Sequence, residues 1–480
     1  MPPAVRAGRR HPRDGGFDRG QDGMSDAASG RLSRLTALIA GNGLRARLLR
    51  GGMGSLMVRV TSMGLTLLLA MVLARALGAE GYGTYAYVFA LVSLLATPAQ
   101  LGLPTLVVRE TAKAEAVGDL GLIRGVWRWS GRLAAGLSLS LALTGGLAAL
   151  VFVGRIPAND MATWAWGLVL VPVIAAANLK GAALQGLGRV VLGQLQEFIL
   201  RPGLHIALVL AALLLAGSLS PARAMSLHVA AALVGLIVTL WLLRRARPQG
   251  LSASPIDTTQ KPRWLATTLP LAALAGMQTI NLHLGVLMMG PLATVEDVGV
   301  YRIVMQGGTL LAFGGHAIAL AVAPTLARLH ALGETRRLQK VAALCSAAVT
   351  ILTVPIAIVF VVWGDRVLGL AFGSEFARGH TALAIVAVGR VVHAAFGSVS
   401  TLLTMTGHER EASRGLAISV VANAVLNLAL IPSYGLAGAA VASVLTLMIW
   451  NLLLWRDARR LVGVDSSLFG LIALRTRNQT

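Results

Sequence analysis

Twelve apolar stretches follow one another along this chain and dominate what it can fold into. A helix of about 20 apolar residues is long enough to cross the ~30 Å hydrocarbon core of a bilayer. The pattern therefore predicts an all-α integral membrane protein with about twelve transmembrane helices. The expected spans are residues 53–77, 84–107, 133–153, 162–183, 192–216, 223–243, 264–289, 299–323, 341–363, 381–404, 415–434 and 436–455.

The composition supports this class and argues against several others. Of the 480 residues, 56% are hydrophobic and 13% are charged, which is too little charge to cover a soluble protein of this size. The net charge of +22 does not call for a nucleic-acid partner, because Lys and Arg gather on the cytoplasmic side of membrane proteins. We expect no enzyme activity, cofactor or metal, since the sequence lacks a Walker A motif, paired acids and metal-ligand spacing.

Two turn sequences recur at nearly the same offset. The Gly-x-Tyr turns at Gly83 and Gly299 are 216 residues apart, and the turns at Gly188 and Gly407 are 219 residues apart. Because both pairs keep their order and spacing, the sequence predicts a duplicated bundle of two pseudo-symmetric six-helix lobes around a central cavity.

The charge pattern predicts the topology and the domains. With the N-terminus inside, 34 Lys and Arg lie on the cytoplasmic side and 6 on the other, so both termini are expected in the cytoplasm. The expected parts are a disordered basic cytoplasmic tail at 1–50, an N-terminal lobe at 51–243, a cytoplasmic linker at 244–263, a C-terminal lobe at 264–456 and a cytoplasmic tail at 457–480. Met1 and Met24 both remain open as the start.

Several segments, in order, carry a family resemblance. They are 73–85 (LARALGAEGYGTY), 102–103 with 108–110, 193–197 with 201–202, 405–409, Asn427 and 431–440. On these segments the chain resembles the polysaccharide transporter family of the MOP superfamily, the O-antigen and oligosaccharide flippases.

The resemblance implies a flippase of the bacterial inner membrane that works by alternating access. Its substrate would be a polyprenyl-diphosphate-linked oligosaccharide for O-antigen, exopolysaccharide or capsule, whose polyprenyl tail stays among the membrane lipids. It further implies coupling to protons or sodium ions, and a polysaccharide polymerase and a chain-length regulator as partners.

Other functions stay open at this point. A membrane polysaccharide polymerase or ligase generally needs a large external loop, whereas the longest external loop expected here is 364–380. A lipid II exporter or a multidrug exporter of the same superfamily is disfavoured because the first span contains no acid. A structural scaffold for polysaccharide synthesis is the remaining alternative.

Two arginines are the charged candidates for substrate binding. Arg suits a diphosphate because its planar guanidinium makes paired contacts and stays charged in poor solvent. Arg59 and Arg390 are the two basic residues well inside spans, where a charge costs at least ~2.5 kcal/mol. Arg59 lies close enough to its helix start to reach the interface instead, whereas Arg390 lies deeper and favours a cavity role. His393 shares the helix face of Arg390 and could couple transport to protons, or be an ordinary interior histidine.

The remaining candidates are uncharged or lie near a helix start. Amide side chains inside spans suit sugar hydroxyls, although interhelical hydrogen bonding explains them equally well. Glu197 and Arg201 are candidates for gating or coupling, with an intrahelical ion pair as the plainer explanation. The amide candidates are Asn178, Gln278, Asn281, Gln306, Asn423 and Asn427.

Overall fold

The computed structural model describes residues 44–151 and 158–470. It divides into residues 1–55 and residues 56–480, and the account below concerns the second unit. Most of the tail expected at 1–50 lies outside the described residues.

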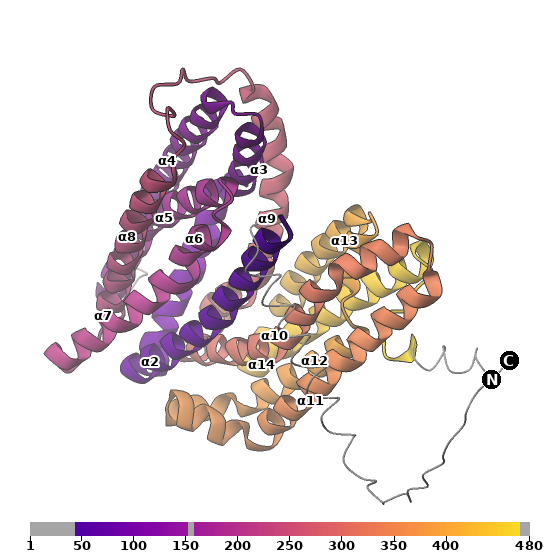
Figure 1. Cartoon of the computed structure of the whole chain (residues 1–480). Coiled ribbons are helices and arrows are strands. Elements are labelled where there is room, and N and C mark those ends of the chain that lie inside the picture. The colour runs from indigo at the N-terminus through magenta and orange to yellow at the C-terminus, as the bar shows by residue number, and fades with distance from the viewer. Residues whose placement is uncertain (1–43, 152–157, 471–480) are drawn as a thin grey trace, which may run out of the picture. The chain divides into compact units, whose positions relative to one another are not determined.

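The described chain is a succession of helices without a strand (Figure 1). We call α2–α8 the N-terminal half and α9–α14 the C-terminal half. The elements are α2 (Leu44–Gln100), α3 (Leu103–Ala116), α4 (Leu120–Val151), α5 (Ala158–Gly186), α6 (Val190–Leu195), the π-helix η2 (Gln196–Leu200), α7 (Arg201–Ala216), α8 (Pro221–Ala246), α9 (Lys261–Leu292), α10 (Val295–Ala331), α11 (Thr335–Phe372), the 3-10 helix η3 (Ser374–Gly379), α12 (His380–Phe396), α13 (Val399–Met405) and α14 (Glu409–Leu461).

The helical membrane fold is confirmed, while the number of spans stays a prediction. Nine helical stretches among the described residues are long and apolar enough to cross a membrane. Two of them, α2 and α14, kink at Gly78 (φ 68°) and Gly435 (φ 52°), backbone angles that glycine adopts without strain. Each of these two helices therefore consists of two segments, as the sequence predicted for its two apolar spans. The chain is a multi-pass membrane protein.

The kink in α2 is held by the end of α11 and by η3, in the C-terminal half. The Ala79 N–H, freed by the kink, donates to the Glu375 carboxylate at 2.7 Å. One turn earlier, the guanidinium of Arg75 donates to the carbonyl oxygens of Leu370 and Ala371. These bonds tie the tight turn of the first apolar pair to α11 and η3.

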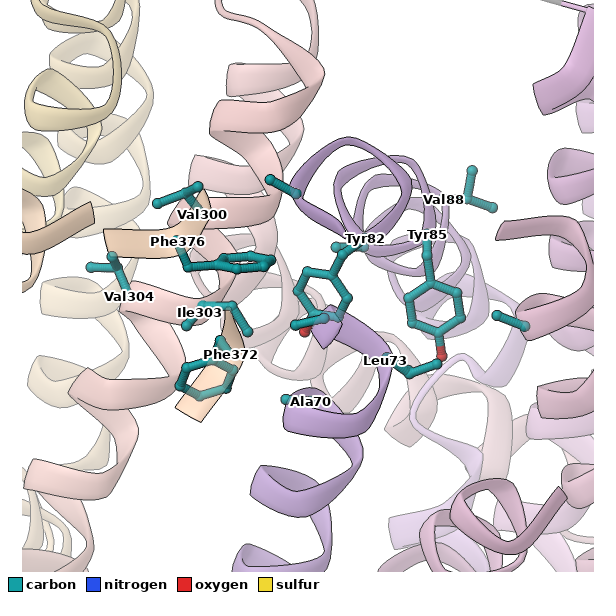
Figure 2. Close-up of a cluster of buried hydrophobic side chains, with 14 of the residues drawn as sticks. Ala70, Leu73, Tyr82, Tyr85, Val88, Val300, Ile303, Val304, Phe372 and Phe376 are labelled. Carbon is teal, nitrogen blue, oxygen red and sulfur yellow. The ribbon is translucent and has the colours of Figure 1, made fainter. Parts of the chain in front are cut away.

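A buried aromatic cluster continues this contact (Figure 2). The Tyr82 ring meets the Phe376 ring edge to face, with centroids 6.2 Å apart, and Tyr82 also lies 6.3 Å from the Tyr85 ring. Val300 and Val304 of α10 are fully buried in the same cluster. In a membrane protein, close packing of this kind holds helices together, and the cluster joins α2 to α10 and η3.

The two Gly-x-Tyr turns meet reciprocally. A Cβ atom at Gly83 would overlap the carbonyl oxygen of Val295, and one at Gly299 would overlap the carbonyl oxygen of Ala79. Gly83 thus packs on Val295, four residues before Gly299, and Gly299 packs on Ala79, four residues before Gly83. Such self-complementary packing is the property of a two-fold interface, and it agrees with the duplication inferred from the sequence.

The segment between α8 and α9 packs against the N-terminal half. The Asp257 N–H donates to the Gly121 carbonyl, and the Arg124 guanidinium donates to the Ser254 carbonyl. Trp264, at the start of α9, is 1% exposed and lies 5.4 Å from the Trp129 ring. The expected linker is therefore anchored to α4.

The residues after α14 also fold back, onto α11 and α12. The Gln339 side chain donates to the Asp465 carbonyl oxygen at 2.5 Å and accepts from the Asp465 N–H at 2.6 Å. The Leu468 N–H donates to the Ala395 carbonyl, and the Ser466 hydroxyl donates to the Phe396 carbonyl. These bonds satisfy backbone groups that are freed where α12 ends.

Candidate functional site

A cavity of about 720 Å³ lies inside the C-terminal half. Its wall is built by α9, α10, α11, α12, α13 and α14, and it reaches the exposed Glu409 at the start of α14. This volume is in the range of small-molecule binding sites. Because all of these helices belong to apolar, membrane-spanning stretches, the polar side chains that line the cavity require an explanation.

Arg390 brings a positive charge to the cavity wall. It lies on α12, is half-buried, and forms no ion pair with any carboxylate among the described residues. Gly308 on α10 faces it, and a Cβ atom there would lie 3.4 Å from the Arg390 Nε atom. The missing side chain leaves room for the guanidinium. An arginine without an ion pair inside an apolar helix is costly, so Arg390 remains a candidate for a functional role.

His393 follows one helical turn after Arg390 and is oriented by its neighbours. Its Nδ1 atom lies 3.0 Å from the Asn451 Oδ1 atom, to which an Nδ1–H donates. Its ring is nearly parallel to the Trp450 ring, with the centroids 6.4 Å apart. The Nδ1–H bond leaves Nε2 as the acceptor nitrogen of the neutral imidazole.

A row of amides forms another part of the wall. The Asn423 Nδ2 atom donates to the Asn281 Oδ1 atom at 3.0 Å, and Asn427 donates to Asn423 in turn. Asn423 and Asn427 are four residues apart on α14, so they share one helix face. The row ties α9 to α14 and presents uncharged polar groups beside the cavity.

The cavity gathers five of the sequence-derived candidates. Asn427 adjoins them through its bond to Asn423 but is fully buried itself. The five that line the cavity are Gln278, Asn281, Arg390, His393 and Asn423.

The other candidates lie elsewhere. Arg59 is exposed on α2, with its guanidinium carbon 5.4 Å from the centre of the Phe198 ring. Asn178 donates to the Gln100 side chain at 3.1 Å. Gln306 is half-buried on α10 and does not line this cavity.

Glu197 and Arg201 do not form the expected ion pair in the described chain. Glu197 belongs to the π-helix η2 and Arg201 begins α7. A π-turn shifts the hydrogen bonds to i→i+5, so residues four apart no longer align as they do in an α-helix. Their gating role stays a prediction.

Sequence reasoning missed several polar residues of the cavity wall. Ser419, Thr446 and Trp450 line the cavity together with Asn451. Ser and Thr are common in transmembrane helices, where their hydroxyls often bond to the backbone of the same helix. Their presence in a span therefore did not predict a position on the cavity wall. The signal was their spacing: Ser419 lies four residues before Asn423, which places both on one face of α14.

The comparison with protein families decides the classification. The family model described as polysaccharide biosynthesis protein matches residues 48–330, more than half of the chain. The chain belongs to this family. The resemblance predicted from the sequence segments is thereby confirmed.

Individual relatives agree with this classification. A probable low-salt glycan biosynthesis flippase of Haloferax volcanii is 27% identical over 161 residues. The match covers 34% of this chain and spans about a third (34%) of the length of that relative.

Solved structures show the fold. An inward-facing multidrug resistance MATE family transporter of the MOP superfamily matches with a TM-score of 0.65 and 15% identity, covering 88% of this chain and 99% of the other. The lipid II flippase MurJ in an inward closed conformation matches with a TM-score of 0.66 and 10% identity, covering 89% and 92%. The architecture is therefore that of the MOP superfamily transporters.

Proposed function

We propose that this protein is a flippase that carries a polyprenyl-diphosphate-linked oligosaccharide across the bacterial inner membrane by alternating access. The transported headgroup occupies the cavity of α9–α14, and the polyprenyl tail remains in the lipid. The protein moves its substrate without a catalytic step.

One observation carries this proposal. A cavity of about 720 Å³ among the apolar helices α9–α14 places Arg390, which forms no ion pair among the described residues, beside amide and hydroxyl side chains. A guanidinium is suited to the oxygens of a diphosphate. Amides and hydroxyls can both donate and accept, as sugar hydroxyls require. Family membership supports the same substrate class, since polysaccharide biosynthesis needs lipid-linked sugars on the outer side of the membrane.

The placement of the contacts supports alternating access. The contacts that join the two halves around Gly78, Gly299 and Phe376 involve turns that the charge pattern assigns to the external side. The cavity reaches Glu409, in a segment that the same pattern assigns to the cytoplasmic side. In this state the substrate enters from the cytoplasm, and opening of the external contacts releases it outward.

Several features belong to the same proposal. Both termini lie in the cytoplasm, and the halves α2–α8 and α9–α14 move as two lobes. Transport is coupled to a proton or sodium gradient, and a polymerase and a chain-length regulator act on the delivered sugar. The product serves a surface polysaccharide such as O-antigen, exopolysaccharide or capsule.

Flipping in proteoliposomes tests the function. A fluorescent polyprenyl-diphosphate oligosaccharide is placed in vesicles with the purified protein, and a sugar-binding reagent outside reports its exposure. We expect exposure to rise with the wild-type protein and not in protein-free vesicles. An imposed proton or sodium gradient that raises the rate identifies the coupling ion. If the label stays on its leaflet while the sugar chain lengthens, the protein is a polymerase and the proposed transport function is wrong.

A further inference from the structure

The cavity of α9–α14 holds a fixed positive charge, a carboxylate and two imidazoles. Arg390 carries the positive charge, and Glu409 lies exposed at the start of α14. The imidazoles belong to His316 and His393. The other described residues that line the cavity are uncharged at neutral pH. The two imidazoles are therefore the groups of this cavity that can change charge near neutral pH, since histidine titrates between pH 5 and 8.

A sugar attached to polyprenyl diphosphate brings two negative charges into this cavity. Each phosphate of such a diester carries one ionised oxygen throughout the neutral range, so the ligand itself does not titrate there. Arg390 offsets one of these charges. The second charge would lie among apolar helices without a cationic partner, which is costly. Binding therefore calls for a second positive charge.

His393 is placed to supply that charge. It follows Arg390 by three residues on α12, so the two side chains share one helix face, with about 5–6 Å between their Cβ atoms. The Nδ1–H bond to the Asn451 Oδ1 atom orients the ring and leaves Nε2 to take up a proton. A protonated His393 then donates from Nε2. Because the two phosphates of a diphosphate share one bridging oxygen, two cations one helical turn apart suit them.

The elements packed against α12 bring no carboxylate into an ion pair with His393 in the described part of the chain. The titratable groups that face the cavity from these elements are His316 of α10 and Glu409 of α14, whereas α11 contributes none. Glu409 pairs with neither histidine. Near the start of α12, η3 carries Glu375, which bonds to the Ala79 N–H, and Arg378, which pairs with acids of α10. A bound anion is thus the group that favours a positive charge on His393.

His316 is the other group that could take up the proton, and it lies farther along its helix. Gly308 of α10 faces Arg390, and His316 follows Gly308 by eight residues, about 12 Å along the helix axis. The His316 Nδ1 atom lies 2.9 Å from the Ala312 carbonyl oxygen of the same helix. A diphosphate held by Arg390 therefore lies closer to His393, which is one turn away.

We propose that His393 is the second cation of the diphosphate site and takes up one proton from the cytoplasmic side when the headgroup binds. The proton adds to the lone pair of Nε2, so the imidazole becomes an imidazolium and no other bond changes. Two negative charges then meet two positive charges, and the diphosphate crosses the membrane as a neutral assembly. This inference rests on the proposed function and names the proton as the ion that binds together with the substrate.

Proton uptake on binding tests this assignment with the full-length protein in nanodiscs. The probes are polyprenyl diphosphate-glucose, which carries two negative charges, and polyprenyl monophosphate-glucose, which carries one. Calorimetric titration in two buffers that differ in ionisation enthalpy counts the protons taken up. Near neutral pH we expect about one proton for the diphosphate probe and none for the monophosphate probe, whose charge Arg390 offsets alone. The complex holds a proton that the free protein lacks, so the diphosphate affinity should fall about tenfold per pH unit as the pH rises.

Substitutions of individual histidines identify the proton acceptor. His393→Gln keeps an amide that can donate to Asn451 but cannot hold a proton. It should abolish the uptake and weaken the diphosphate probe about tenfold near neutral pH, as expected for a lost charge-assisted contact. Unchanged affinity for the monophosphate probe shows that this variant is folded. His316→Gln should retain the uptake, and the matched control is His330→Gln, exposed on α10 outside the cavity.

Three outcomes would overturn the proposal while leaving the flippase function intact. They are binding of the diphosphate probe without proton uptake, equal uptake with both probes, and uptake that persists in His393→Gln. In the third case, loss of uptake in His316→Gln would assign the proton to His316 instead. If the wild-type protein binds neither probe, the proposed function fails and the role of His393 fails with it, a result distinct from the other three.

Discussion

Equivalent tyrosines in the two halves have different neighbours, which are aromatic rings and imidazoles in one half and a hydroxyl beside the cavity in the other. Tyr85 in α2 and Tyr301 in α10 are 216 residues apart, the same offset as their neighbouring glycines. The Tyr85 hydroxyl bonds to the His228 Nδ1 atom at 2.8 Å, and the stacked imidazoles of His228 and His205 lie beside it with centroids 4.6 Å apart. The Tyr301 hydroxyl instead bonds to Ser443, which lines the cavity of Arg390.

The comparison shows that equivalent positions in the two halves have interiors of different composition. In the N-terminal half, aromatic rings and buried imidazoles pack against Tyr85. In the C-terminal half, smaller polar side chains leave room for a cavity. Interiors of proteins are close-packed, so a cavity of this size is maintained only where the surrounding helices hold it open. We infer that the C-terminal half binds the headgroup and that the N-terminal half supports it.

The largest expected effect tests this division directly. Arg390→Ala should lower the initial flipping rate more than about tenfold, because a charge-assisted contact contributes about 1.5–3 kcal/mol. His228→Phe keeps a ring in the N-terminal half and should keep the rate within about twofold, with a lower melting temperature because the Tyr85 hydroxyl loses its hydrogen-bond partner. The proteoliposome assay measures both variants.

Arg245→Ala is the matched control for Arg390. Arg245 is exposed on α8 and stacks on Trp241, with 3.9 Å between its guanidinium carbon and the ring centre. Its removal should leave flipping unchanged. Loss of transport in His228→Phe with normal transport in Arg390→Ala would reverse the roles of the two halves.

The next prediction concerns stability at the contact between Gly83 and Gly299, where the two halves pack reciprocally. Gly83→Ala and Gly299→Ala should each destabilise the protein by about 1–3 kcal/mol, since the new methyl group must displace a backbone carbonyl. Thermal unfolding in detergent measures the change. Gly64→Ala is the control on the same helix, because no atom lies within 4 Å of its added Cβ. Equal stability of Gly83→Ala and Gly64→Ala would contradict the reciprocal packing.

A smaller effect compares the two segments that fold back after each half. The Asp465 carboxylate accepts from the Trp455 indole at 2.9 Å and from the Ser467 N–H at 3.0 Å, so Asp465→Ala should cost about 1–2 kcal/mol. Asp257→Ala, in the segment after the first half, should change the melting temperature less. A larger loss from Asp257→Ala would show that the first segment contributes more to stability.

The smallest effect is a pH dependence at Asp257. Hydrogen bonds from the Thr259 N–H and hydroxyl hold the pKa of Asp257 below its ordinary value of 3.8. A lowered pKa stabilises the folded state above the unfolded pKa, and this contribution is lost as the pH falls through the folded pKa. Thr259→Ala should therefore reduce stability slightly at neutral pH, and the difference from wild type should vanish in acid. A difference that persists at pH 2 would contradict this assignment.

Which of the candidate residues line the cavity is determined by how the helices pack against one another. The sequence singled out Arg390 because a charge among apolar residues is recognisable from the sequence alone, and the structure places it on the cavity wall. It left Arg59 open between substrate binding and reaching the interface, and the structure places Arg59 exposed on α2, over the Phe198 ring. It passed over Thr446, which only the tertiary structure places beside the cavity. The position of a residue along a helix can be determined from the sequence. Which face of the helix contacts its neighbours depends on the tertiary structure.

The sequence by itself determined the membrane class, the duplication and the family, because apolar length, turn spacing and motif order are properties of the linear chain. Only the tertiary structure decided where the cavity beside Arg390 lies, that Gly83 and Gly299 pack reciprocally, and that the segments near Asp257 and Asp465 are anchored. The physical reason is that lipid drives helices into the membrane without specifying their partners. Close packing and hydrogen bonds between helices then select one arrangement.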